Sequence, residues 1–259
     1  MGREYYMDKK ETSIAVINMM LMKYNLYPFI SEFCDKIEII ESDCFYDSIM
    51  QYTGTEGQRE KIMLCKEQFE YIDATILMPQ TKNKTAYILL KTDLSLEASI
   101  RKTIHEMIHL VHRCIITKKL TLPNLYEIEE QGDYKLFYYF DEFLTKKKEI
   151  IIYYDLLHKN KKIVDDDVYI NTMAKKFELA KESSNILEFM RDELFAIAET
   201  MAYQQIFTTM FPEDFIENRA NISDINEIVQ ILGKFDSIDI FIDNTDKIET
   251  VINMIERNF

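Results

Sequence analysis

The sequence predicts an α+β fold that is predominantly helical, with a small antiparallel sheet packed on one helix and a helical C-terminal layer. Three observations lead to this prediction. The 259 residues include only five glycines and four prolines, so long stretches lack the residues that usually end helices. Two neighbouring segments in the first half are rich in β-branched and aromatic residues, as strands are. Most other segments carry apolar residues at helical spacing.

Composition and charge restrict the class of protein. Hydrophobic residues make up 47% of the chain and charged residues 29%, which is typical of a globular protein with its own core. Asp and Glu number 45 against 31 Lys and Arg, giving a net charge of −14 at pH 7. Proteins that bind nucleic acids usually have the opposite balance, so we expect no nucleic-acid partner. The four cysteines lack C-x-x-C spacing, and we expect reduced thiols.

The N-terminal part shows no pattern of membrane insertion or secretion. Its longest apolar run, Ile14 to Met22, contains Asn18 and is too short to cross a bilayer. Asp8 and Glu11 precede this run, and no small-residue cleavage site follows it. We therefore expect a cytoplasmic protein without a membrane partner.

The first elements are predicted from local signals. Thr12 and Ser13 are candidate N-caps of a first helix that ends before Pro28. The segment Lys36 to Ile40 alternates like a short strand.

The predicted sheet consists of two strands. Ala74 to Met78 and Thr85 to Lys91 are rich in strand-forming residues, and the polar stretch Gln80 to Lys84 separates them. A turn between two such strands predicts an antiparallel pair.

A helix follows, capped by Asp93 or Ser95 and running to about Ile116. Its apolar stripe consists of Ile100, Ile104, Met107, Ile108 and Val111. A neighbouring polar stripe consists of Arg101, His105, His109 and His112. The pattern predicts a helix with one face in the core and another opening on a cleft.

The rest of the chain is predicted to be mainly helical, beginning with a long helix from Tyr134 to Leu157. Its run Lys146 to Lys148 is interpreted as a solvated flank. Isoleucines at every second position from Ile238 to Ile242 indicate a short strand, and a last helix starts at Thr245. We expect a first domain of residues 1–160 and a helical region of residues 161–259, which could form a layer of the same domain.

The sequence His105-Glu106-Met-Ile-His109 is an H-E-x-x-H motif. Residues four apart lie on one face of a helix, so both histidines can present a ring nitrogen to one metal ion. Glu106 lies about 100° around the helix from His105, where its carboxylate can reach a water molecule without binding the metal. This arrangement predicts two metal ligands and a general base.

A third ligand must come from elsewhere, because catalytic zinc usually has three protein ligands and an open position for water. A glutamate from a later helix would complete the set, and the candidates are Glu142, Glu149, Glu193 and Glu199. Glu142 and Glu149 lie two turns apart, about 10 Å along a helix, so at most one of them can bind the ion. Spacing alone does not choose among the four.

Four segments together resemble the ImmA/IrrE family of zinc metallopeptidases over residues 74–157. They are Ala74 to Pro79, Tyr87 to Leu90, Thr103 to His112 and Asp141 to Phe143. The resemblance implies a zincin-like core and one bound zinc ion.

The resemblance also implies a ligand set. Glu142-Phe-Leu-Thr145 matches the family's E-x-x-A segment, with Thr in place of Ala, so zinc would be held by His105, His109 and Glu142. Glu193-Leu-Phe-Ala196 fits the same pattern and is the alternative third ligand. Ile108 stands where the family commonly has Gly.

Two more residues are candidates for the site. His112 follows His109 by three residues and could contact substrate, although a hydrogen-bonded histidine on the helix surface explains it equally well. Tyr138 precedes Glu142 by one turn and could donate a hydrogen bond to an oxyanion, although a packing role is common for such a tyrosine.

These residues predict a zinc-dependent metalloendopeptidase. The family resemblance implies cleavage of a specific regulatory protein in bacteria, phages or mobile elements. The strand Thr85 to Lys91, if it is a sheet edge, could pair with an extended peptide substrate. The alternative is a metal-binding module that binds a protein partner without cutting it, and a third hypothesis is a helical interaction protein without metal.

Overall fold

The computed structural model describes most of the chain: residues 8–53, 59, 63, 66, 72–80, 84–157, 166–207 and 214–259. Contacts group the chain into two units, Met1–Glu129 and Glu130–Phe259. The two units meet between Glu129 and Glu130, about 30 residues before the domain boundary that the sequence predicts at residue 160. The reason is that the helix α6 (Tyr134–Leu157) packs against α8 (Ile186–Ile206) and belongs to the second unit.

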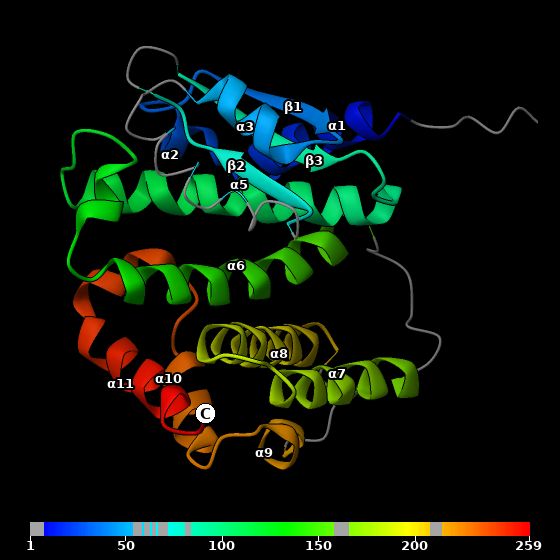
Figure 1. Ribbon diagram of the computed structural model, residues 1–259, viewed down its shortest axis with the longest axis vertical. Helices are drawn as coiled ribbons and strands as arrows, with labels where there is room; N and C mark the ends of the chain where they lie inside the picture. Colours follow the sequence, from blue (N-terminus) through cyan, green and yellow to red (C-terminus); the bar gives the residue numbers. More distant parts are fainter. Residues whose placement is uncertain are drawn as a thin grey trace, which may run out of the picture. The chain divides into compact units, whose positions relative to one another are not determined.

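The first unit contains a three-stranded sheet and several helices (Figure 1). Its elements are α1 (Lys9–Lys23), α2 (Tyr27–Ile30), β1 (Lys36–Ser42), α3 (Phe45–Tyr52), β2 (Ala74–Leu77), β3 (Thr85–Lys91) and α5 (Leu96–Lys119). The 3-10 helix η2 (Glu127–Glu130) lies at the boundary of the two units. The α+β class and the predominance of helix are confirmed.

The sheet is mixed, with the strand order β1-β3-β2. β2 and β3 pair antiparallel, with Ile76 opposite Ile88, as predicted. β1 pairs with β3 in parallel, with Ile39 opposite Ile88, so the prediction of a purely antiparallel sheet is wrong. The reason is that the segment predicted as an isolated strand, Lys36 to Ile40, joins the sheet. Parallel strands need a long connection between them, and here the segment that contains α3 and β2 provides it. β3 can therefore run in the same direction as β1.

β3 is the central strand and is buried on both faces. Leu89 packs with Phe45 and Ile49 of α3 on one face. Ile88 and Leu90 point to the opposite face, which α5 and α1 cover (Figure 1). Thr85–Lys91 is therefore not the sheet edge that we considered for substrate pairing; among the described strands, the edges are β1 and β2.

The start of α1 differs from the prediction. Its N-cap is Asp8, whose carboxylate accepts a hydrogen bond from the Lys10 amide at 3.0 Å. Thr12 and Ser13 lie inside the helix and are buried. Asp8 is as good a capping residue as Thr or Ser, and it stands one turn earlier.

α5 forms as the sequence predicts. The Ser95 side chain accepts a hydrogen bond from the Ala98 amide at 3.1 Å and caps the helix. The apolar stripe from Ile100 to Val111 is buried throughout. This face holds α5 against the sheet and α1.

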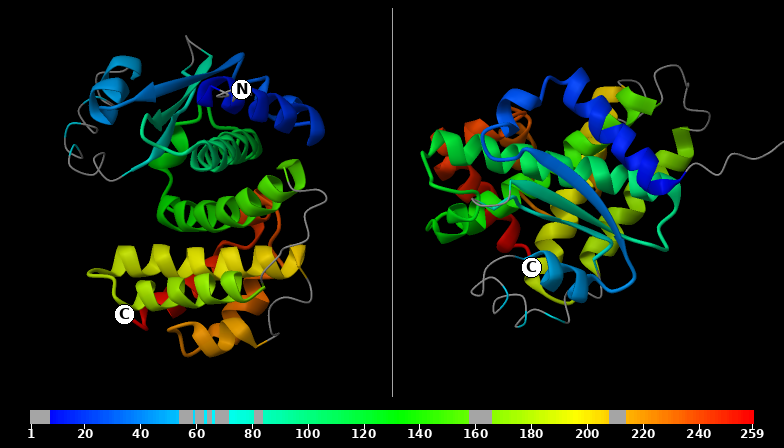
Figure 2. Two further views of the ribbon diagram at one scale, coloured as in Figure 1. Left: turned by 90° about the vertical axis from the view of Figure 1, so that its right-hand side faces the viewer. Right: turned by 90° about the horizontal axis from the view of Figure 1, so that it is seen from above.

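The second unit is helical in its described part. Beyond α6 and α8 it contains α7 (Asp166–Lys181), α9 (Phe215–Arg219), α10 (Ile225–Leu232), the 3-10 helix η3 (Ile238–Asp243) and α11 (Thr245–Glu256). α8 packs between α6 and α7, and Figure 2 shows α7 and α8 side by side. The ring of Phe140 on α6 contacts the rings of Phe235 and Phe241.

The predicted strand from Ile238 to Ile242 is wrong, because this segment forms η3. Ile238 and Phe241, three residues apart, are both buried. That spacing places two side chains on one face of a 3-10 helix, whereas a strand would bury every second residue.

The interpretation of Lys146 to Lys148 as a solvated flank is also wrong. Lys146 forms ion pairs with buried carboxylates, and Lys147 is itself buried. Burial lowers the pKa of Lys147 and of Lys148 below that of an exposed lysine. The reason is that α6 packs against α8, η3 and α11, which leaves little of this turn in water.

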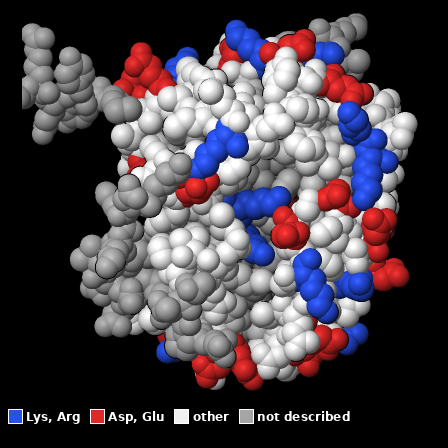
Figure 3. Space-filling model, turned by 180° about the vertical axis from the view of Figure 1, so that it is seen from behind, with Lys and Arg blue, Asp and Glu red and all other residues white. Residues whose placement is uncertain are grey.

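No helix of the described residues has the length and hydropathy needed to cross a membrane. On the face of the molecule in Figure 3, acidic and basic side chains are interspersed.

We predict that Ser95→Ala destabilises the protein by about 1 kcal/mol, because it leaves the Ala98 amide without its capping acceptor. Ser95→Asp retains an acceptor and is the matched control. Urea unfolding followed by circular dichroism measures both variants. Equal stability of the Ala and Asp variants would contradict a capping role for Ser95.

Candidate metal centre

His105 and His109 lie on a partly open stripe of α5. The residues on either side of them along the helix, including Glu106 and Ile108, are buried, whereas both histidines are half-buried. The stripe continues at a spacing of four residues through Arg101 and Arg113. Arg113 donates a hydrogen bond to the Glu129 carboxylate at 2.9 Å. The face opposite the core thus carries two imidazoles between two arginines.

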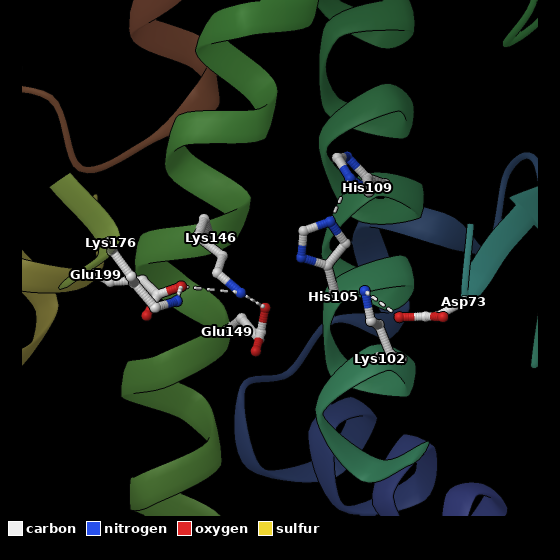
Figure 4. A network of polar contacts seen from close by, with 8 residues as sticks. All are labelled: Asp73, Lys102, His105, His109, Lys146, Glu149, Lys176 and Glu199. Carbon is white, nitrogen blue, oxygen red and sulfur yellow. Dashed lines mark hydrogen bonds and ion pairs between the residues drawn. The ribbon is translucent and has the colours of Figure 1, made fainter. Parts of the chain in front are cut away.

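The two rings are positioned as metal-binding histidines would be. Their Nε2 atoms are 3.1 Å apart, and the ring planes meet at 77° (Figure 4). Two nitrogens that bind one tetrahedral zinc ion at ~2.1 Å lie about 3.4 Å apart. The pair therefore fits a shared ion after a shift of a few tenths of an ångström. A hydrogen bond between the two rings accounts for the same distance when one of them is the donor.

The segment of α5 that precedes the motif is held by contacts within the first unit. The Thr103 hydroxyl donates to the Ser99 carbonyl oxygen at 2.8 Å, one turn before the motif. Lys102 lies 3.8 Å from the Asp73 carboxylate, which links α5 to the start of β2 (Figure 4). Glu106 lies one residue after His105 and is only 7% exposed.

His112 does not lie on the open stripe. It is 1% exposed, whereas Arg113 occupies the next position of the four-residue spacing after His109. The sequence predicted that His112 contacts substrate or lies on the helix surface, and a side chain that is almost fully buried supports neither role. The sequence could have placed Arg113 on the open stripe instead, because it follows His109 by four residues.

Glu142 lies on α6 in the second unit and is half-buried. On its core side, the Thr145 hydroxyl donates to the Asp141 carboxylate at 3.3 Å, and both residues are buried. Thr145 thus packs in the interior, about one turn after Glu142.

Tyr138 shares the Glu142 face of α6. It keeps 40% of its surface exposed, yet surrounding protein and the neighbouring Glu142 carboxylate raise the pKa of its hydroxyl above the ordinary value. The direction of this shift means that Tyr138 retains its proton at neutral pH. It can therefore donate a hydrogen bond.

Two of the other candidate ligands are engaged in ion pairs within the second unit. Glu149 is 3% exposed and binds Lys146 at 3.1 Å. Glu199 is 2% exposed and binds Lys176 at 2.5 Å and Lys146 at 3.3 Å.

Glu193 is fully buried and holds a loop. One carboxylate oxygen accepts a hydrogen bond from the Asn221 backbone N–H at 2.8 Å. The other accepts a hydrogen bond from the Asn221 side-chain Nδ2 at 3.1 Å. The same side chain donates to the Phe177 carbonyl oxygen at 2.7 Å. Burial raises the pKa of the Glu193 carboxyl, and the Asn221 hydrogen bonds oppose this shift.

Among the described residues, His105, His109 and Glu142 are a group that could hold a metal ion. Two imidazoles and one carboxylate fit zinc, which binds nitrogen and oxygen ligands.

Comparison with models of known protein families, with curated proteins and with solved structures gave no match to this chain.

We predict that Glu193 makes stability depend on pH. A carboxyl whose pKa is raised in the folded state holds its proton longer there, so its contribution is complete below the unfolded pKa. That contribution is lost as the pH rises through the folded pKa. The free energy of unfolding of the wild type should therefore fall with rising pH in this window relative to that of Glu193→Gln.

Urea unfolding at a series of pH values measures this difference. Glu188→Gln on the same helix is the control with opposite sign, because hydrogen bonds from Ser184 lower the pKa of Glu188. Parallel pH profiles for the wild type and Glu193→Gln would contradict the prediction.

Proposed function

We propose that this protein is a zinc-dependent metalloendopeptidase with a zincin-like core, acting in the cytoplasm on a specific regulatory protein. The observation that carries the proposal is the pair of Nε2 atoms 3.1 Å apart, on His105 and His109 of a helix whose opposite face is buried. Glu106 lies between them in the sequence, where this motif requires a general base.

In this proposal Glu142 is the third ligand. Glu193 is the poorest alternative, since Asn221 occupies both of its carboxylate oxygens. Glu149 and Glu199 would have to leave lysine partners in a nearly water-free environment. Glu142 is half-buried and retains the exposure that a ligand needs.

The chemistry assigns one role to each side chain. Zinc, when bound, supplies a Lewis acid that polarises a carbonyl and activates a water molecule. Glu106 accepts the proton of that water and passes it to the leaving amine. Tyr138, which keeps its proton, donates a hydrogen bond to the oxygen of the attacked carbonyl.

The edge strand β2 is the proposed site for pairing with the substrate backbone. The Lys91 amide donates to the Asp73 carbonyl oxygen at 3.0 Å, so these two residues form a hydrogen-bonded pair. Such pairs alternate along an antiparallel ladder, and the backbone groups of Ala74 and Ile76 therefore point away from β3. They can pair with an extended peptide.

The rival candidate is a metal-binding module that recognises a protein without cutting it. The observation in its favour is the low exposure of Glu106, since a general base must reach water. Both candidates bind zinc, so only a test of Glu106 separates them.

We predict that the purified protein binds one zinc ion and that Glu142→Gln weakens binding by more than about 100-fold, the upper range for loss of an outer partner. Glu193→Gln should bind zinc as the wild type does. Competition with a chromogenic chelator measures both affinities. If Glu142→Gln retained zinc and Glu193→Gln lost it, Glu193 rather than Glu142 would be the third ligand.

We predict that Glu106→Gln retains zinc but lowers the rate of peptide hydrolysis by about 10²- to 10⁴-fold, the usual contribution of a general base. Cells that express either form provide the assay. A target protein should be cut only with the wild type and should co-purify with Glu106→Gln. Wild-type cellular function in Glu106→Gln would favour the non-proteolytic module.

A further inference from the structure

Four charged side chains form an ion-pair network around two buried carboxylates in the second unit. Lys146 lies 3.1 Å from Glu149 and 3.3 Å from Glu199, and Lys176 lies 2.5 Å from Glu199 (Figure 4). Both carboxylates are almost without exposed surface. The network joins α6, α8 and α7, and its formal charges cancel.

A network of this kind restricts how α6 can lie on α8. A shift of α6 by one residue would move its side chains about 1.5 Å along the axis and rotate them by about 100°. Lys146 would then lose Glu199, and a nearly buried carboxylate would lose one of its charge partners, which is unfavourable. Such a rotation would also carry buried apolar side chains of α6, such as Phe143 and Leu144, out of their contacts. The ion pairs and the apolar packing together therefore select one rotation and one register of α6.

The same face of α6 carries the proposed third ligand. Glu142, Lys146 and Glu149 are spaced by four and then three residues, which places them in one row along the helix. A metal ligand must lie within roughly 0.5 Å of its productive position. The direction of the Glu142 carboxylate thus depends on the rotation that Lys146 fixes one turn away.

We propose that Lys146 is a positioning residue for the metal centre, acting through its pairs with Glu149 and Glu199 on the direction of Glu142. This inference rests on the proposed function, because it requires Glu142 to be a ligand. Lys146 itself has no part in the chemistry.

Lys147 offers a matched control. It is the next lysine of the same turn, is also buried, and faces the negative charge of Asp236 rather than the network. Its side chain points about 100° away from that of Lys146. Removal of its charge perturbs the same helix without touching the Glu142 row.

The test compares zinc affinity in folded full-length protein. The single variant Lys146→Met would leave two buried carboxylates with only one lysine. The double variant Lys146→Met/Glu149→Gln is therefore compared with it, because it removes one charge of each sign. The double variant retains the ion pair of Lys176 with Glu199. Circular dichroism establishes that each variant is folded. We expect the double variant to bind zinc about 10- to 100-fold more weakly than the wild type. Lys147→Met should bind as the wild type does, and Lys146→Arg should recover most of the affinity.

Cobalt(II) in place of zinc gives a readout that a change of stability alone would not alter. Its visible absorption reports the ligand geometry, and we expect a changed spectrum for the double variant and a wild-type spectrum for Lys147→Met. Wild-type zinc affinity and cobalt spectrum in the folded double variant would overturn the positioning role, as would equal effects of the Lys146 and Lys147 substitutions. Wild-type zinc affinity in Glu142→Gln would instead overturn the ligand set, and the positioning role with it.

Discussion

The burial of one face of α5 is the constraint on which the candidate site depends. Ile104 and Met107 are fully buried, and the helix contacts the sheet and α1 along this face. Because α5 cannot rotate without exposing these side chains, His105 and His109 must project from the other side, one turn apart. Helix geometry brings both side chains to one face, and their conformations place the two Nε2 atoms 3.1 Å apart. A rigid pair of nitrogens is the part of a metal centre that one helix can supply.

The rotation of α6 in the second unit is constrained differently, because other elements cover α6 on several sides. Contrast between an apolar and a polar face constrains the rotation of such a helix less strictly. Here the ion pairs of Lys146 with the buried carboxylates of Glu149 and Glu199 add a second constraint on the rotation. In the first unit the rotation is set by contrast between an apolar and a polar face. In the second unit, pairing of charges adds to the apolar packing of α6, and this pairing needs more than one helix to be present.

Local signals in the sequence were sufficient for α5 and for the β2–β3 pair, because each depends on residues close together in the chain. They limited the cap of α5 to Asp93 or Ser95, and the structure shows Ser95. The parallel pairing of β1 with β3 was not predictable, since it joins residues about 50 positions apart. The sequence of neither strand indicates which other strand it pairs with. The ion pairs of Lys146 escaped prediction for the same reason. A run of lysines indicates solvent until the helices that surround it are known. His112 was assigned to the histidine stripe by residue type, whereas the spacing of four selects Arg113.

The mixed sheet has a consequence for the order in which the first unit folds. β2, β3 and α5 follow one another within residues 74–119, so their contacts close short loops and form at low entropic cost. β1 must find β3 across a much longer segment, and parallel pairing cannot begin from a tight turn. We therefore expect the hairpin and the motif helix to assemble early and β1 to dock late. The histidine pair would then be in place before the sheet is complete.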